Sequence, residues 1–170
     1  MRIHVLAHRF SAFLPVIAIS TVAALAQPSG QAGFDKLKSL AGTWEAKHDD
    51  GSVTTVTYKV VSSGSAVVET ISYGKEPDGM VTVYHLDGAK LMLTHYCGAG
   101  NQPRMVAEAS ADPSKLTFKY LDATNLKSPD DGHMRGLAVT FDGPDRFSQA
   151  WTWKAKGQES SEVFKYQRRK

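Results

Sequence analysis

Polar and apolar side chains alternate along most of the chain after residue 42. In residues 55–60, Val56, Tyr58 and Val60 alternate with threonine and lysine, which is the pattern of a strand with one buried face. The same alternation, separated by turn residues, predicts strands at 43–48, 52–61, 65–74, 80–86, 89–97, 103–110, 115–121, 134–141, 146–154 and 160–167. The chain is therefore predicted to be all-β, with about ten strands.

One segment before the strands has a different period. Phe34, Leu37 and Leu40 follow helical spacing, so residues 33–40 are predicted to form one short helix that ends near Gly42. When every strand has one apolar face, those faces are most simply buried if the sheet closes into a barrel. Closure also removes the exposed edges of the sheet. The prediction is a single antiparallel up-and-down β-barrel. About ten strands enclose more space than side chains readily fill, so a cavity is expected.

Turn residues fix the register of two hairpins. The turn at 49–51 places Val56 opposite Trp44 and both inside. The Asp87-Gly88 turn is expected to oppose Leu86 to Ala89, Tyr84 to Leu91, Thr82 to Leu93 and Met80 to His95. If the leucine face is inside, His95 and Cys97 point into the barrel. The opposite choice stays open, because Val81, Val83 and Met92 are also apolar.

Polar residues on the predicted inner face are the candidates for chemistry. A lone charge in an apolar lumen is costly, so Glu69 and Arg104 are expected to pair with each other or with a polar ligand. In a small-molecule pocket such polar groups would orient a ligand, and aromatic side chains would contact its apolar body. Trp153 is one of the aromatic residues expected in this wall. The only long connection, from Asp122 to His133, is expected to reach the open end. The predicted ligand-binding residues are Glu69, Tyr84, His95, Arg104, Phe118, Asn125, His133, Gln149 and Trp151, with Trp44 closing the barrel.

Two other interpretations of these residues remain. His95 and Cys97 lie two apart on one strand and, with His133, His85 or His48, could ligate a metal, although no CxxC or HExxH motif accompanies them. Direct activation of Cys97 by His95 is disfavoured, because residues two apart on a strand are about 7 Å apart. An enzyme or metalloprotein using His95, Cys97 and His133 is thus one alternative. A structural envelope protein with a filled core is the other. No motif indicates a cofactor.

The first residues have the layout of an export signal. Arg2 and Arg9 precede an uncharged run that ends in Ala24-Leu25-Ala26, which predicts a signal peptide at 1–26, a linker at 27–32 and a barrel domain at 33–170. The protein is expected in the periplasm or secreted, with no membrane insertion after cleavage. The single cysteine excludes an internal disulfide. The net charge of the mature chain, about +1, does not suggest binding to nucleic acid.

A short motif points to a family. Leu40-Ala41-Gly42-Thr43-Trp44, between a helix and a β-meander, resembles the Gly-x-Trp entry of lipocalins and the wider calycin superfamily, in which the tryptophan plugs one end of the barrel. Segments 93–97, 101–105 and 132–134 resemble bacterial exported lipocalin-like proteins of unknown function. Haem-binding nitrobindins also use ten strands, but Glu45-Ala46-Lys47 follows Trp44 here in place of glycines, and no histidine follows His133. The resemblance implies the barrel fold but no activity. From the expected cavity and its lining we predict a protein that binds an apolar or amphipathic small molecule.

Overall fold

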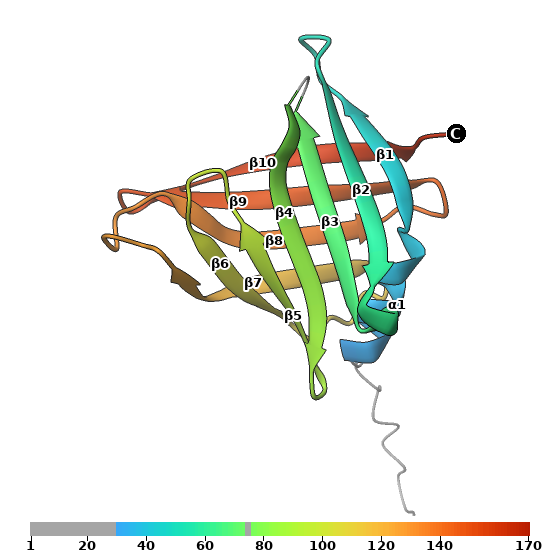
Figure 1. Cartoon of the computed structure of the whole chain (residues 1–170), viewed down its shortest axis with the longest axis horizontal. Helices are drawn as coiled ribbons and strands as arrows, with labels where there is room; N and C mark the ends of the chain where they lie inside the picture. The colour runs from blue at the N-terminus through green and yellow to red at the C-terminus, as the bar shows by residue number, and fades with distance from the viewer. Residues whose placement is uncertain (1–29, 74–75) are drawn as a thin grey trace, which may run out of the picture.

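The computed structural model describes residues 30–73 and 76–170, and the side chains of 76–78 are left out of the description. One helix, α1 (Gly30–Ser39), precedes ten strands (Figure 1). The strands are β1 (Gly42–Lys47), β2 (Val53–Val61), β3 (Ala66–Tyr73), β4 (Glu76–Asp87), β5 (Lys90–Tyr96), β6 (Gln102–Ala107), β7 (Lys115–Thr124), β8 (His133–Phe141), β9 (Arg146–Ala155) and β10 (Gln158–Arg168). A short 3-10 turn, Ser62–Gly64, lies between β2 and β3. The predicted signal peptide lies outside the described residues.

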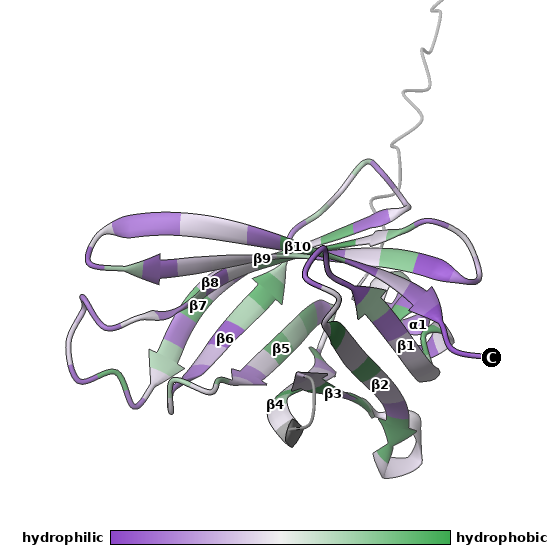
Figure 2. Cartoon of the chain, turned by 90° about the horizontal axis from the view of Figure 1, so that it is seen from above, coloured by the Kyte–Doolittle hydropathy of each residue, from purple (hydrophilic) through white to green (hydrophobic). Residues whose placement is uncertain are grey.

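The ten strands form one closed antiparallel barrel in chain order. Each strand pairs with its neighbours in the sequence, and β1 pairs with β10 to close the sheet, with Trp44 opposite Arg168. In Figure 2 the strands β9 and β10 lie across the lumen from β3 to β5, and purple and green residues alternate along the strands. The predicted all-β barrel with one short N-terminal helix is confirmed. Within the described residues, no helix is long and apolar enough to cross a membrane.

Alternation places the core as predicted in most strands. Trp44 and Val56 are paired and fully buried, which confirms the register of the first hairpin. Leu91, Leu93 and His95 are buried, so the leucine face of β5 is the inner one. Val60, predicted to be inside, is 42% exposed, since it lies near the end of β2.

The register of the β4–β5 hairpin differs from the prediction by two residues. Leu86 lies opposite Leu91, Tyr84 opposite Leu93 and Thr82 opposite His95. The two loop residues are Gly88 and Ala89, and only Gly88 has a positive φ, 59°, which fits the first loop position of a type II′ turn. A shift of two residues leaves every side chain on its predicted face, so the error did not affect the inner-face assignment.

Helix α1 and Trp44 close one end of the barrel. Phe34 and Leu37 of α1 are buried. The helix approaches the β4–β5 turn so closely that a Cβ at Gly30 would overlap the carbonyl of Ala89. The Trp44 indole donates to the Leu40 carbonyl (2.7 Å) and meets the Phe147 ring edge-on at 4.9 Å between centroids.

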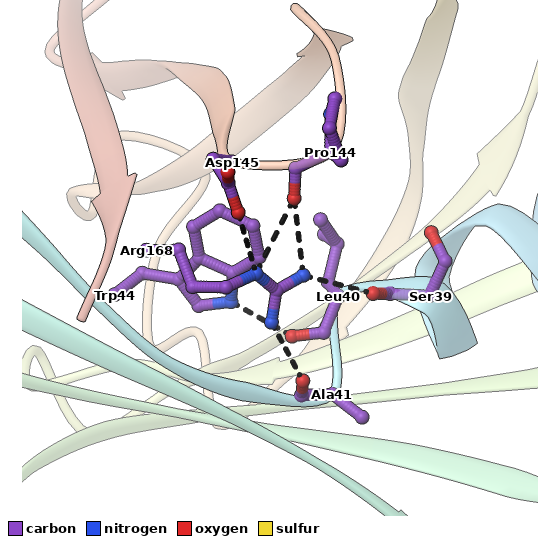
Figure 3. Close-up of polar contacts among 7 residues, drawn as sticks. All are labelled: Ser39, Leu40, Ala41, Trp44, Pro144, Asp145 and Arg168. Atoms are coloured by element: carbon purple, nitrogen blue, oxygen red, sulfur yellow. Dashed lines mark hydrogen bonds and ion pairs between the residues drawn. The ribbon is translucent and has the colours of Figure 1, made fainter. Parts of the chain in front are cut away.

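Arg168 lies over the Trp44 ring at this end of the barrel (Figure 3). Its guanidinium lies 4.0 Å from the centre of the Trp44 ring and donates to the carbonyls of Ser39, Ala41 and Pro144. An arginine stacked on a desolvated indole gains both electrostatic and packing energy. The last strand is thereby joined to the helix–β1 connection and to the β8–β9 turn.

Candidate functional site: the open end of the barrel

A polar layer crosses the middle of the barrel. Cross-strand pairing sets Tyr58, Glu69, Thr82 and His95 side by side on four neighbouring strands. From the opposite wall, the Gln149 amide donates to the Tyr58 hydroxyl (2.9 Å) and to both Glu69 carboxyl oxygens (3.1 Å each). All five side chains are at most 1% exposed.

Glu69 is the centre of this layer. The Tyr84 hydroxyl donates to Glu69 Oε2 (2.5 Å), and Gln149 contributes the bonds above. Burial raises the pKa of the Glu69 carboxyl, while the hydrogen bonds from Tyr84, Gln149 and Tyr58 partly oppose that rise. The same burial, with Glu69 nearby, raises the pKa of Tyr58 and Tyr84 well above the usual range, so both hydroxyls stay protonated donors. Tyr58, Glu69, Tyr84 and Gln149 thus form a hydrogen-bonded network that separates the closed end from the open end.

Above this layer the barrel holds a cavity of about 320 Å³. This volume lies at the lower end of the range found for small-molecule pockets. Six strands contribute the lining, which is dominated by aromatic rings and methionines, with a polar rim from the start of β10. The lining residues are Tyr73, Met80, His95, Met134, Trp151, Trp153, Ser160, Ser161, Glu162 and Phe164.

His95 is the buried polar group of the cavity lining. Its ring stacks at an angle on Trp151, with centroids 4.6 Å apart, and its Nδ1 forms a 2.9 Å hydrogen bond with the Thr82 hydroxyl. The other ring nitrogen, Nε2, is buried and has no hydrogen-bond partner among the described residues. Burial lowers the pKa of His95 to about 4, so the imidazole is neutral near pH 7. A neutral imidazole with one unpaired nitrogen offers a single hydrogen bond to an uncharged group.

Trp151 connects the cavity to the polar layer. Its indole Nε1 donates to Gln149 Oε1 (3.4 Å), while its ring supports His95 and lines the cavity. The side chain is 4% exposed. The floor of the cavity therefore consists of the His95–Trp151 pair, held in place by the hydrogen bond between His95 and Thr82 and by the one that Trp151 donates to Gln149.

The structure distributes the predicted ligand-binding residues over several levels. His95 and Trp151 line the cavity. Glu69, Tyr84 and Gln149 belong to the polar layer beneath it. Phe118 packs against Tyr84 at 5.8 Å between centroids.

The two residues predicted from the long loop lie beside the cavity. His133 is the first residue of β8, is 4% exposed, stacks on Tyr120 at 5.1 Å and binds the Asp131 carbonyl through Nδ1 (2.8 Å). Asn125 is exposed and donates to Gln102 Oε1 (3.0 Å). The loop itself is shorter than expected, because β7 continues to Thr124.

Arg104 was predicted to face the lumen and to pair with Glu69, and both predictions are wrong. Arg104 lies opposite Thr94 on the outer face, where it forms a bidentate ion pair with Asp122. Met105, opposite Leu93, takes the inner position. The register of β6 with β7 shifts between Arg104 and Met105, and apolar residues occupy both faces here, so alternation alone did not identify the inner one.

Several cavity residues were not identified from the sequence. Tyr73 and Met80 share the face of Glu69 and Thr82, so strand parity would have placed them inside. Ser160, Glu162 and Phe164 lie on the inner face of β10, where polar residues at the mouth interrupt the apolar pattern. The signal is weak there, because inner residues beyond the core need not be apolar.

The cysteine and histidines of the alternative interpretation do not gather. Across residues 30–73 and 76–170, no group of three or more His, Cys, Asp or Glu side chains is arranged to hold a metal ion. Cys97 is a half-buried free thiol, and burial raises its pKa, which opposes thiolate formation.

Comparison with solved structures supports the fold. One crystal structure, described as a protein with unknown function from the DUF3598 family of Nostoc punctiforme, aligns with a TM-score of 0.52 and 12% sequence identity. The alignment covers 79% of this chain and 49% of that chain, so this chain spans about half the length of the other protein. No protein-family model and no curated protein matches the sequence. At this identity the comparison indicates the barrel fold alone, and the lipocalin resemblance stays a prediction.

Proposed function

We propose that the protein binds a small, uncharged, mostly apolar molecule in the open-end cavity. The observation that carries this proposal is the unpaired Nε2 of His95, a buried nitrogen at the floor of an aromatic cavity. Burying a polar atom without a partner costs about 1–3 kcal/mol, and a ligand that hydrogen-bonds to it recovers this free energy. Trp151, Trp153 and Phe164 would contact the body of the ligand.

The chemistry of the cavity selects against a charged inner end. His95 is neutral because of its burial, and Arg104, the predicted partner for an acidic group, lies on the outer face. An anion at the floor would meet no positive charge among the lining residues. An alcohol, amide, phenol or secondary amine would satisfy Nε2 and leave its apolar part in contact with the rings.

N-phenyl-1-naphthylamine, an uncharged aromatic amine whose emission rises in apolar surroundings, is a direct probe. Saturable binding with one site and competition by 1-octanol are expected. His95→Leu should weaken probe binding by about 2- to 10-fold, the effect of one hydrogen bond. His85→Leu is the matched control, because His85 lies opposite Met92 on the outer side of β4.

The proposal fails if the probe does not bind saturably, or if the two histidine variants bind it equally. Native mass spectrometry of the protein purified from its own host adds an independent result. An organic adduct supports the proposal, whereas a metal adduct would favour the metalloprotein interpretation.

The proposal of export rests on the sequence of residues 1–26. We propose that the barrel acts in the periplasm or outside the cell after removal of residues 1–26. N-terminal sequencing of the protein from its host should begin at Gln27, and a chain that retains Met1 would contradict export by cleavage.

A further inference from the structure

A second buried polar atom without a partner lies beside the cavity. Asn101, 3% exposed, ends the turn between β5 and β6, where its carbonyl accepts from the Cys97 amide (3.1 Å). Its Nδ2 donates to the Gly132 carbonyl (2.8 Å) in the loop before β8. This bond fixes the orientation of the side-chain amide and leaves Oδ1 buried, with no hydrogen-bond partner among the described residues.

Asn101 lines a cleft of about 320 Å³ that is separate from the His95 cavity. The two spaces share Trp153, which lines both. The indole lies so close to Gly132 that a Cβ at that position would overlap the ring. The Trp153 ring therefore borders both the cavity and the cleft, and Gly132 leaves the room that the ring needs. The cleft is lined by Ala99, Asn101, Asn125, Lys127, Asp131, Gly132 and Trp153.

The chemistry of this cleft suits a neutral hydrogen-bond donor. Asp131 Oδ2 already accepts from the backbone amides of Lys127 (2.7 Å) and Ser128 (3.1 Å), so part of its charge is compensated inside the loop. Lys127, a residue of opposite charge to Asp131, lines the same cleft. Asn101 Oδ1 is an acceptor only, and it needs a hydroxyl or an amide N–H.

We propose that this cleft is the outer half of one binding site, in which Asn101 Oδ1 accepts a hydrogen bond from a hydroxyl or amide at the outer end of the ligand. The proposal rests on the proposed function, because the body of the same ligand fills the His95 cavity, which shares the Trp153 ring with the cleft. The ligand class that follows is an uncharged molecule with an apolar middle and a polar group at each end. His95 contacts the inner group and Asn101 the outer one.

Linear alcohols of matched length test this assignment. We would measure displacement of N-phenyl-1-naphthylamine by 1-alkanols and by α,ω-diols of six to twelve carbons, in the full chain. An alkanol can satisfy His95 alone, whereas a diol of the right length satisfies both sites. Asn101→Leu should weaken binding of the best diol by about 5- to 10-fold, the loss of one buried hydrogen bond, and change alkanol binding less than about 2-fold.

Gln167→Leu is the matched control, because it also exchanges a side-chain amide for leucine. Gln167 is an exposed residue of β10 at the closed end, opposite Glu45, and lines neither the cavity nor the cleft. This variant should leave the ratio of diol to alkanol affinity unchanged. An unchanged ratio in Asn101→Leu at every length overturns the two-ended site, although alkanol displacement would still support the cavity. Failure of both alcohols in the parent protein contradicts the proposed function itself.

Asn101→Leu also removes the bond to Gly132, so a second variant guards against loss of the loop. Asn101→Asp keeps acceptor oxygens and lacks the donor Nδ2. If the leucine variant binds neither alcohol, the aspartate variant decides. Retention of the diol preference supports the proposal, and its loss overturns it.

Discussion

The two ends of this barrel both contain tryptophan rings, but they differ in how their buried polar atoms are hydrogen-bonded. At the closed end, Trp44 is fully buried, its indole N–H reaches the Leu40 carbonyl, and Arg168 covers its outer face. At the open end, Trp151 and Trp153 border a cavity, and one ring nitrogen of His95 has no hydrogen-bond partner within the described part of the chain. The closed end satisfies its polar atoms with the protein's own groups. In our proposal, a ligand supplies the missing hydrogen bond at the open end.

The polar layer explains why the two ends can differ. Glu69, Tyr58, Tyr84 and Gln149 hydrogen-bond to one another across the lumen and fill its middle. A filled layer of this kind resists collapse of the open end onto the core, because the cross-section at this level is fixed by directional bonds. The depth of the cavity is set by His95 and Trp151, which lie above the layer.

The largest expected contrast is between two tryptophans. Trp44→Ala removes a fully buried ring and its contacts with Phe147 and Arg168, so it should lower the free energy of unfolding by about 3–5 kcal/mol. Trp153→Ala removes a half-buried ring that borders a cavity, so the loss should be nearer 1 kcal/mol. Urea denaturation of both variants measures the contrast. Equal losses would contradict the division between a packed end and an open end.

The second contrast concerns pH. The pKa of His95 falls to about 4 in the folded protein, below its unfolded value near 6.5. As pH falls from about 6.5 to about 4, the unfolded chain binds a proton that the folded barrel does not, so stability should fall by as much as about 3 kcal/mol. Glu69 has the opposite sign. Its raised pKa means that the folded state holds a proton that the unfolded state releases, and stability falls as pH rises above about 4.5.

Variants separate the two contributions. Unfolding of Glu69→Gln, measured between pH 4 and 7, should retain the loss of stability toward acid. Unfolding of the Glu69→Gln/His95→Leu double variant should lack it. If both variants lose the same stability between pH 6.5 and 4, His95 is not the buried neutral imidazole described above.

The third contrast is between two arginines. Arg168→Met removes the cation over Trp44 and donors to three carbonyls at the closed end, and should cost about 2 kcal/mol. Arg104→Met breaks an exposed ion pair with Asp122, where solvent screens the charges, and should leave the melting temperature unchanged. Calorimetry of both variants measures the two losses of stability. A larger loss for Arg104→Met than for Arg168→Met would contradict this expectation.

The smallest effect expected is a gain. Replacing both His95 and Thr82 by apolar residues, in the double variant Thr82→Val/His95→Leu, removes the Nδ1–Thr82 hydrogen bond together with the unpaired Nε2. Because no orphaned partner remains, stability should be unchanged or higher by about 1 kcal/mol, while affinity for N-phenyl-1-naphthylamine falls. A substantial loss of stability would show that His95 serves the fold and not a ligand.

The sequence predicted the fold better than it predicted the site. Alternation located ten strands, and the turn at 49–51 correctly placed Val56 opposite Trp44. Long, one-sided strands carry that information locally. Arg104 was misplaced because β6 has apolar residues on both faces and shifts register with β7. The unpaired atoms of His95 and Asn101 depend on which donors lie nearby in three dimensions, and the pattern along the chain does not contain that.

The most direct test of the account uses the three tryptophans of the chain as separate reporters. Indole N–H resonances of ¹⁵N-tryptophan-labelled protein would be assigned by substitution and followed during titration with N-phenyl-1-naphthylamine. We predict that the Trp151 and Trp153 resonances shift to saturation with one affinity, while that of Trp44 stays in place. A shift confined to Trp44, or no saturable shift at Trp151 and Trp153, would contradict binding at the open end.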